Sequence, residues 1–406
     1  MFHVAYVVTH PIQYQAPLLK YLACTNEINV QVFYLSDFSL QQHYEEAFDH
    51  KFRFDVGLTE GYEWKVLPQI FGRPSQPSRP WLPMRELISS LRSVKFDAVW
   101  VHGWGHLGLV QAVDAARRLG LPVLLRGEST PEPHSQSVLR HHLSARLHRW
   151  LFHRVSAFLA IGSRNREYYR QHGVNDERVF SVPYAVDNDY FQSRSMNARG
   201  QRENLRQSLS LLPGRPVVLF AAKFIDAKAP DELLAAFKLV CHRAAKNSRP
   251  YLLFVGDGPL RRQLEEQARP LDDAVRFLGF RNQSELPALY DLCDLFVLPS
   301  SFEPWGLVVN EAMNAARPII VSDRVGAAAD LVENGKNGFV YPSGNVAELA
   351  AAMTHTLESA NLRDQMGRAS RKRIAAWNFS ADRAGLLAAL NQVTQLNYRQ
   401  EKAFGG

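Results

Sequence analysis

Residues 303–311 read EPWGLVVNE and follow the apolar run LFVL at 295–298, which predicts a short buried strand. A helix is expected to begin near Gly306, so a strand, a loop and a helix N-terminus follow one another. Glu303 would precede that N-terminus, and Glu311 would lie within the helix. Because a helix N-terminus exposes unpaired backbone N–H groups at the positive end of its dipole, this segment predicts an anion site.

Two carboxylates placed around such a site suit a diphosphate that is joined to a sugar and a nucleoside. Glu303 would accept hydrogen bonds from sugar hydroxyls. Glu311, further along the helix at about 1.5 Å of rise per residue, would reach the ribose. The alternative is an ordinary amphipathic helix that happens to carry two glutamates, and the motif alone leaves both interpretations open.

The composition is typical of a soluble enzyme with more than one domain. A chain of 406 residues exceeds one typical core, and its 46% apolar and 21% charged residues are ordinary for a globular protein. Its three cysteines show neither disulfide nor zinc spacing. No apolar run reaches the roughly 18 residues of a membrane span, and the N-terminus is expected to be a buried strand and not a signal peptide. We therefore expect a cytoplasmic protein without a metal or cofactor.

A net charge of +7 allows nucleic acid, an anionic membrane or an anionic substrate as partner. Nucleic acid is disfavoured because no basic stripe is interleaved with aromatic residues. Basic residues gather in the segment 140–154, where Leu139, Leu143, Leu147 and Trp150 recur at helical spacing. This segment predicts either a helix that lies peripherally on the inner face of a membrane or, as we favour, a core-packing helix with a solvated basic face.

Short apolar runs alternate with helical segments along the whole chain, which indicates βαβ units and parallel sheets. The predicted strands lie at 4–8, 30–34, 98–101, 122–125, 157–161, 217–220, 251–255, 275–278, 295–298 and 319–321. The pattern restarts after a polar, arginine-rich segment at 188–215. We therefore predict an α/β protein with two Rossmann-like domains that face a deep cleft: an acceptor-binding domain at 1–190 and a nucleotide-sugar-binding domain at 191–380. The last helix, within 381–406, is expected to pack back on the first domain, and the Pro-rich stretch 69–81 is expected to be a loop.

Two lysines follow the first strand of the second domain, in FAAKFIDAKAP. Lys223 and Lys228 would clamp a diphosphate from two sides and neutralise the charge of a departing diphosphate. Gly256, in GDGP after the next strand, permits a tight turn and a close approach of a ligand. Each feature alone is equally consistent with ordinary surface structure.

Three polar groups follow strands of the first domain. His10, Gln13 and Tyr14 come after the first strand, His102 follows another, and Glu128 follows a third. Because the carboxyl ends of parallel strands meet at one edge of a sheet, all three groups are expected near an acceptor. Glu128 is the catalytic candidate that would orient an acceptor hydroxyl. Any one of these groups is as consistent with a structural role.

These motifs together resemble the retaining glycosyltransferases of family 4, which have the GT-B fold. EPWGLVVNE is similar to the E-x7-E motif of that family, and FAAKFIDAKAP to its phosphate-binding segment. GDGP, VRFLGF at 275–280, the PSS before Glu303, DLVENGKNGFVYPSGN at 330–345 and VPYAVDNDYF at 182–191 fall in family order. The resemblance covers nearly the whole chain.

The resemblance implies metal-independent transfer of a sugar, with retention, from a UDP-, GDP- or ADP-sugar to a glycan or polyprenyl-linked acceptor, in the context of bacterial surface polysaccharide assembly. It implies that Glu303 binds the donor sugar and that backbone near Phe280 meets the base. The implied donor-side residues are Lys223, Lys228, Gly256, Phe280, Arg281, Phe302, Pro304, Trp305, Gly306, Leu307 and Glu311.

The chain departs from the family pattern at four places, which concern the details of the site more than its class. Lys223 stands for the usual arginine, Ala222 for a preferred glycine, and Glu128 for a common histidine, while the first loop lacks the common glycine pair. Three alternatives remain from the sequence: an epimerase or phosphorylase on the same fold, a non-catalytic sugar-nucleotide-binding subunit, and a membrane adaptor that uses the 140–154 segment.

Overall fold

The computed structural model describes residues 1–40, 43–45, 50–52, 54–67, 83–131, 146–245 and 248–404. The chain divides into two compact units. Unit 1 comprises Met1–His43, Val56–Tyr184 and Phe379–Gly406, and unit 2 comprises Tyr44–Asp55 and Ala185–Asn378. The predicted loop at 69–81 lies outside the described residues, as does the start of the predicted helix at 140–154.

Unit 1 is built on one parallel sheet of seven strands in the order β5-β2-β1-β6-β7-β8-β9. The strands are β1 (Phe2–Val8), β2 (Ile28–Tyr34), β5 (Glu63–Val66), β6 (Ala98–His102), β7 (Val123–Arg126), β8 (Ala157–Ala160) and β9 (Val179–Ser181). Its helices include α1 (Ala16–Ala23), α2 (Met84–Arg92), α3 (Leu107–Arg118), α5 (Ser163–Gln171) and α15 (Phe379–Phe404). The sequence predicted the five apolar strands but missed β5 and β9, because β5 is short and only partly buried and β9 has three residues.

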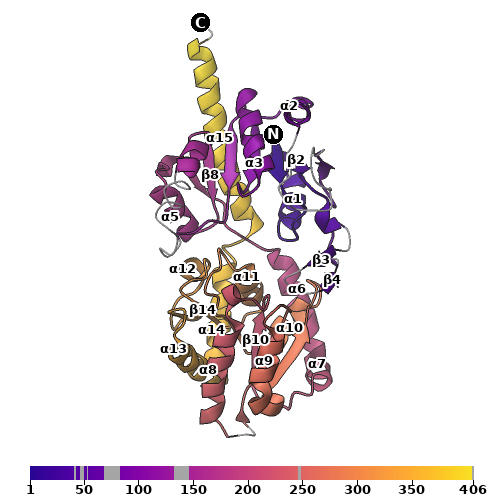
Figure 1. Cartoon of the computed structure of the whole chain (residues 1–406), viewed down its shortest axis with the longest axis vertical. Coiled ribbons are helices and arrows are strands. Elements are labelled where there is room, and N and C mark those ends of the chain that lie inside the picture. Colours follow the sequence, from indigo (N-terminus) through magenta and orange to yellow (C-terminus); the bar gives the residue numbers. More distant parts are fainter. Residues whose placement is uncertain are drawn as a thin grey trace. The chain divides into compact units, whose positions relative to one another are not determined.

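Helices cover both faces of this sheet, which explains its continuous apolar strands. Along β1, Ala5 and Val7 join one core cluster with α2 and α3, whereas Val4, Tyr6 and Val8 join a second cluster on the other face. That second cluster also contains residues of α1 and of α15. Figure 1 shows α15, in yellow, beside β8. The C-terminal helix therefore completes the core of unit 1.

Unit 2 contains a six-stranded parallel sheet in the order β12-β11-β10-β13-β14-β15. The strands are β10 (Val217–Ala221), β11 (Tyr251–Val255), β12 (Val275–Gly279), β13 (Leu295–Leu298), β14 (Ile319–Ser322) and β15 (Gly338–Tyr341). Its helices include α8 (Pro230–Arg243), α9 (Arg261–Ala268), α11 (Leu307–Asn314), α13 (Val346–Glu358) and α14 (Ala360–Ile374). Two parallel, Rossmann-like sheets confirm the predicted fold class.

Two segments differ from the sequence-based expectation. The arginine-rich stretch at 188–215 is largely helical, as α6 (Asn188–Ala198) and α7 (Arg202–Ser208), and unit 2 begins at Ala185, before the predicted boundary. Its helices escaped prediction because their apolar face is narrow: Phe191 is the one large apolar side chain buried in α6. The segment Tyr44–Asp55 belongs to unit 2, which no sequence pattern had indicated.

The helix within the basic segment 140–154 also differs from the core-packing interpretation that the sequence favoured. Residues 146–152 are helical, but Leu147 is 60% exposed and Trp150 is 42% exposed, so these two apolar residues do not pack in the core. Leu151 and Phe152 are buried instead. The helix thus contacts the core through a neighbouring face. Leu139 and Leu143 lie outside the described residues.

Candidate functional site

The loops that follow β10, β11 and β12 are held together at the carboxyl edge of the unit 2 sheet. Gly256 N donates to Gly279 O over 2.9 Å, and Phe224 N donates to Asp257 O over 2.9 Å. Gly256 has a φ of +131°, and a Cβ added there would lie 2.0 Å from the carbonyl oxygen of Ala222. Only glycine fits this close approach of two backbones. The predicted turn therefore brings the first two loops of the candidate donor site into contact.

The central pair of the candidate donor site is Lys228 and Glu303, which arise from the loops after β10 and β13. Lys228 Nζ lies 2.5 Å from Glu303 Oε2, and the two side chains are 19% and 15% exposed. The loops also meet through their backbones, since Phe302 N donates to Ala227 O over 3.2 Å. Two oppositely charged groups, both accessible, thus stand together at the edge where open α/β sheets bind ligands.

The N-terminus of α11 follows Glu303 directly in the chain. Its N-cap residue, Gly306, has a φ of +95°, a left-handed conformation that side chains rarely adopt. A Cβ at Gly306 would also lie 3.0 Å from Leu298 and 3.2 Å from the Cγ of Glu303. Glycine therefore lets the chain turn tightly from Glu303 into the helix. The amide groups of the first helical turn follow the Lys228–Glu303 pair, as the sequence predicted.

Glu311 occupies the second turn of α11 and is fully buried. The hydroxyl of Tyr290, in α10 (Leu286–Leu292), donates to its Oε2 over 2.6 Å. This environment is unusual for a glutamate, because burying a carboxylate is costly unless it is hydrogen-bonded. The ribose contact implied by the resemblance stays a prediction, since the structure gives Glu311 no exposed surface.

The resemblance implied that Trp305 is a donor-side residue, and the structure places its side chain in the core of unit 2. It is 3% exposed, its Nε1 donates to Asn310 Oδ1 over 3.0 Å, and its ring stacks on Trp377 with centroids 5.0 Å apart. Its backbone carbonyl accepts from Ala327 N over 2.9 Å. Phe302, in contrast, is 42% exposed beside Glu303, so its ring is accessible to a ligand.

The other predicted donor residues lie on the same edge of the sheet. Lys223 and Phe280 follow β10 and β12 and are partly exposed. Arg281 forms an ion pair of 2.9 Å with Glu285. Pro304 and Leu307, which flank the turn into α11, are also partly exposed.

The carboxyl edge of the unit 1 sheet carries a different kind of cluster. His102 ends β6 and is buried, whereas Glu128 follows β7 and is 50% exposed. The hydroxyl of Tyr184 donates a short hydrogen bond to Glu128 and lies 3.3 Å from His102 Nε2. Because the tyrosine proton goes to Glu128, His102 would donate from Nε2 to the tyrosine oxygen. The three side chains form a chain of hydrogen bonds that ends at an accessible carboxylate.

The pKa values of this cluster follow from burial and from these contacts. Burial lowers the pKa of His102, so the imidazole is neutral near pH 7. Burial raises the pKa of Glu128, but interactions with His102 and Tyr184 outweigh that effect and hold the pKa below its ordinary value. Burial raises the pKa of Tyr184 well above its ordinary value. The cluster therefore presents one negative charge, on Glu128, with neutral partners.

Arg126, two residues before Glu128, anchors the cluster to the C-terminal helix. Its Nη2 lies 3.0 Å from Asp382 Oδ1 and donates to the carbonyl oxygens of Val182 and Pro183. Arg126 is 1% exposed and Asp382 is 2% exposed. Burial raises the pKa of Asp382 to about 7, although Arg126 acts in the opposite direction. This buried pair fixes α15 to β7 and the chain segment that carries Tyr184.

Of the predicted acceptor-side residues, the structure brings His102 to Glu128, with 3.8 Å between His102 Nε2 and Glu128 Oε1. His10, Gln13 and Tyr14 lie in the loop after β1, the strand beside β6, and all are partly exposed. His10 Nδ1 contacts Thr9 Oγ1 at 2.9 Å. Sequence reasoning missed the roles of Tyr184 and Asp382, because each reaches the cluster from a distant segment, and the motif at 182–191 that contains Tyr184 did not indicate a contact with Glu128.

Two further observations concern partners. Across the described residues, no helix combines the length and apolar character that crossing a membrane requires. In the same part of the chain, no group of three or more His, Cys, Asp or Glu side chains is arranged to hold a metal ion.

Comparison with known proteins finds a glycosyltransferase family model in each part of the chain. Residues 201–373 match the family model described as glycosyl transferases group 1, and residues 30–185 match that of the glycosyl transferase 4-like domain. Alpha-D-kanosaminyltransferase of Streptomyces kanamyceticus is 31% identical over 216 residues, which are 52% of this chain and 54% of that protein. D-inositol 3-phosphate glycosyltransferase 2 of Catenulispora acidiphila is 29% identical over 247 residues, 58% of this chain and 56% of that protein. The chain thus spans about half the length of these relatives.

Solved structures show the fold. HepE from Anabaena, in complex with UDP, has a TM-score of 0.71 to this chain at 18% identity, covering 98% of this chain and 99% of that one. Sucrose-phosphate synthase from Thermosynechococcus elongatus has a TM-score of 0.66 at 19% identity, covering 99% and 100%. The fold is that of the GT-B glycosyltransferases. With the two matching family models, the chain belongs to the glycosyl transferases group 1 family.

Proposed function

We propose that this protein transfers a sugar, with retention of anomeric configuration, from a nucleotide-sugar donor to a glycan or lipid-linked acceptor. The observation that carries the proposal is the accessible Lys228–Glu303 pair, 2.5 Å apart, at the carboxyl edge of the unit 2 sheet and before the N-terminus of α11. A lysine and a helix N-terminus suit a diphosphate, and a carboxylate suits sugar hydroxyls. HepE, with the same fold, has been solved with UDP and with UDP-glucose.

The ion pair suggests how Lys228 and Glu303 exchange each other for groups of the donor when the donor binds. Lys228 and Glu303 neutralise each other, so the site holds no uncompensated charge at this point. A diphosphate competes for Lys228, and Glu303 then accepts from the sugar hydroxyls. Lys223 adds a second cation after the same strand, β10. As the bond to the sugar breaks, the lysines and the amide groups of α11 stabilise the charge that develops on the leaving diphosphate. Because side chains and a helix N-terminus stabilise this charge, we predict that a chelator does not lower the activity.

For unit 1 we propose binding of the acceptor hydroxyl at Glu128. A half-exposed carboxylate that keeps its charge accepts a hydrogen bond from a hydroxyl and orients its oxygen for attack. Tyr184 and neutral His102 hold the carboxylate in place through the hydrogen bonds described above. In the mechanism of the family that the chain resembles, the leaving phosphate oxygen accepts the proton of the acceptor hydroxyl. Glu128 would therefore orient the acceptor without having to remove its proton.

The test is a thermal-shift screen with UDP, GDP and ADP and their sugar conjugates, with and without EDTA, followed by product analysis by NMR. A ligand at 100 times its dissociation constant should stabilise the folded state by about 2.7 kcal/mol. Sugar transfer with an unchanged anomeric configuration supports the proposal. Conversion of the donor without an acceptor would indicate an epimerase. Release of a sugar phosphate would indicate a phosphorylase, and binding without turnover would indicate a non-catalytic subunit.

For location we propose a cytoplasmic protein that acts on surface polysaccharide intermediates and touches the inner face of the membrane. The exposed Leu147 and Trp150 support this proposal, because Arg146 and Arg149 lie on the same short helix and Arg154 lies just after its end. Apolar side chains flanked by arginines are typical of helices that lie in the interface of an anionic bilayer.

A further inference from the structure

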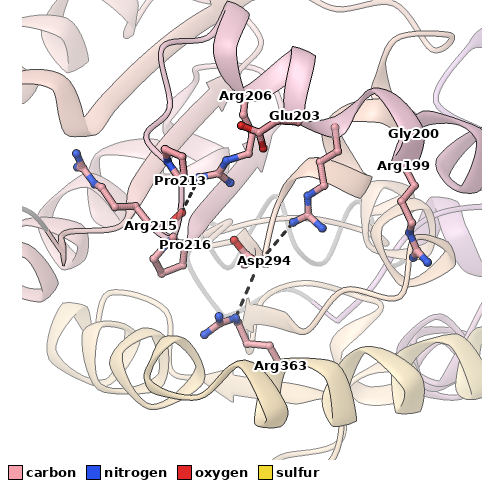
Figure 2. Close-up of a pocket in the computed structure, with 11 residues that line it drawn as sticks. Arg199, Gly200, Glu203, Arg206, Pro213, Arg215, Pro216, Asp294 and Arg363 are labelled. Atoms are coloured by element: carbon pink, nitrogen blue, oxygen red, sulfur yellow. Dashed lines mark hydrogen bonds and ion pairs between the residues drawn. The ribbon is translucent and has the colours of Figure 1, made fainter.

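A pocket of about 490 Å³ opens in unit 2 among an unusual number of arginines (Figure 2). We call it the arginine pocket. Its arginines are Arg199, Arg202, Arg206, Arg215 and Arg363. Glu203 and Asp294 are the acidic residues of its lining, and Asp291 and Asp273 outside the lining pair with Arg199 and Arg215, so positive charge is still in excess. Such an excess attracts an anion.

The arginine pocket lies at the end of the sheet opposite the candidate donor site. Pro216 and Asp294, both part of its lining, directly precede β10 and β13. Lys223 and Glu303 follow the same two strands at their carboxyl ends. Because β10 has five residues, at about 3.3 Å each, roughly 15 Å of sheet separates the two places. A ligand in the arginine pocket would therefore not occupy the donor site.

Two of the arginines hold the wall of the pocket in place through hydrogen bonds. Arg206 is 8% exposed, and its Nη2 donates to Leu212 O over 2.7 Å and to Arg215 O over 3.0 Å. Arg215 is 6% exposed and donates to the hydroxyl of Tyr251 over 2.8 Å. They fix the wall of the pocket, and their positive charges add to its field without needing to move.

Asp294 does not satisfy the other arginines. Its Oδ2 accepts from Val217 N over 2.8 Å, and its Oδ1 lies 3.6 Å from Arg202 and 4.0 Å from Arg363, which is too far for hydrogen bonds. Figure 2 draws these two ion pairs, with Arg363 reaching toward Asp294. Arg202 Nη2 donates to Leu292 O over 2.9 Å, and Arg363 Nη1 donates to Leu357 O over 2.6 Å. A guanidinium carries five N–H donors, so each of the two side chains has further N–H groups with which to bind an acceptor in the pocket.

We propose that the arginine pocket binds the phosphate group of a small ligand, held between Arg202 and Arg363, with Arg199 at the rim. A phosphate offers several acceptor oxygens that match planar guanidinium groups, which a simple halide ion does not. The pocket volume exceeds that of phosphate and leaves room for an attached moiety of sugar size. The phosphate group belongs either to a soluble phosphomonoester or to the headgroup of an anionic lipid.

The first experiment is a calorimetric titration with inorganic phosphate at constant ionic strength. The test protein is the double variant Arg202→Gln/Arg363→Gln, and the control is Arg262→Gln, an arginine of the same unit that is 92% exposed on α9. We expect phosphate to bind at least tenfold more weakly to the double variant and unchanged to the control. Equal affinity in all three proteins would overturn the proposal. Should the double variant fail to fold, Arg199→Gln, at a position 68% exposed, replaces it, and affinity equal to that of the control would then overturn the proposal.

Lys228→Ala separates the arginine pocket from the proposed donor site. Phosphate binding that persists in Lys228→Ala and falls in the double variant supports the arginine pocket, whatever the fate of the proposed function. Binding that is lost in Lys228→Ala and intact in the double variant would place phosphate in the donor site alone and overturn the inference, while leaving the proposed function standing.

A second arm identifies the source of the phosphate. Flotation with phosphatidic acid vesicles, compared with phosphatidylcholine vesicles, tests a lipid headgroup, and titration with glycerol 3-phosphate tests a soluble phosphomonoester. Arginine-dependent binding in the first assay assigns the headgroup, and arginine-dependent binding in the second assigns the soluble ligand. Loss of arginine dependence in both would contradict the proposal.

Discussion

In unit 2 the charged side chains at the carboxyl edge of the sheet meet near the surface, whereas in unit 1 the strongest ion pair lies in the interior. Lys228 and Glu303 are 19% and 15% exposed, and Arg126 and Asp382 are 1% and 2% exposed. The group that unit 1 leaves accessible is Glu128, whose hydrogen-bond partners are neutral. One edge therefore offers charge to a ligand and the other offers hydrogen bonds.

The difference corresponds to the two substrates of the proposed reaction. A nucleotide sugar carries a diphosphate, which calls for cations and helix amides that a ligand can reach. The hydroxyl group of an acceptor substrate carries no charge, so it is best bound by one hydrogen-bond acceptor whose position is held rigidly. The buried pair in unit 1 supplies the frame, and the exposed pair in unit 2 is itself the proposed binding group. Variants of the buried pair should consequently lose stability, whereas variants of the accessible pair should lose activity.

The largest effect is expected from Arg126→Met, which leaves Asp382 buried without its cation. Breaking a buried ion pair by removing one partner typically costs about 3–5 kcal/mol. Hydrogen exchange of the amides in β7 and α15 would measure the loss in unit 1 alone. The double variant Arg126→Met/Asp382→Leu is the control and should recover part of the stability. A loss below about 1 kcal/mol would show that the pair is not the anchor we describe.

This loss should also depend on pH. Burial raises the folded-state pKa of Asp382 to about 7, above its ordinary value of 3.8, so its protonated form favours the fold at low pH. That contribution falls as the pH rises from about 4 to about 7. Without Arg126 the carboxylate is harder to ionise, so Arg126→Met should lose more stability at pH 8 than at pH 5. An equal loss at both values would contradict the assignment.

Most of the fold could be predicted because both sheets are buried on two faces. Strands such as β10, with five fully buried apolar residues, stand out in the sequence, and the charged residues that follow them are local in the chain. Lys228 and Glu303 were predicted in this way, although their direct contact was not. Of the unit 1 cluster, His102 and Glu128 were named from the sequence, but Tyr184 and Asp382 were not, because Tyr184 reaches Glu128 from 56 residues away and Asp382 reaches Arg126 from 256 residues away. Such contacts depend on how helices return to a sheet.

The next effect in size is expected for Lys228→Ala, which should damage activity and leave stability nearly intact. Removing one group that stabilises charge in the transition state typically lowers turnover by about 100- to 1000-fold. We expect a loss of this order in kcat/KM with the donor identified by the thermal-shift screen. Lys336→Ala, at a lysine of the same unit that is 70% exposed, should keep wild-type kinetics. Full activity in Lys228→Ala would remove Lys228 from the proposed donor site.

A smaller effect is expected for Tyr184→Phe, which removes the hydroxyl that donates to Glu128. Losing one hydrogen bond to a charged group costs about 1.5–3 kcal/mol, so kcat/KM for the acceptor should fall by about tenfold or more. The pKa of Glu128 is held low partly by Tyr184, so it should rise in the variant. The acid limb of the pH–rate profile should then move to higher pH. A lower rate with an unmoved acid limb would leave Tyr184 a purely structural role.

The smallest effect is expected for Trp150→Ser, which tests whether unit 1 contacts a membrane. Trp150 is 42% exposed and lies close to Arg154, whose guanidinium is 3.9 Å from its ring centroid. Because only part of one side chain would insert, affinity for anionic vesicles should fall by only a few-fold, at about 25 cal/mol per Å² of apolar surface. Leu212→Ser is the matched control, since Leu212 is 56% exposed in unit 2. Equal vesicle binding by both variants would assign the exposed tryptophan no role at the membrane, and the basic helix would then serve unit 1 through its buried face alone.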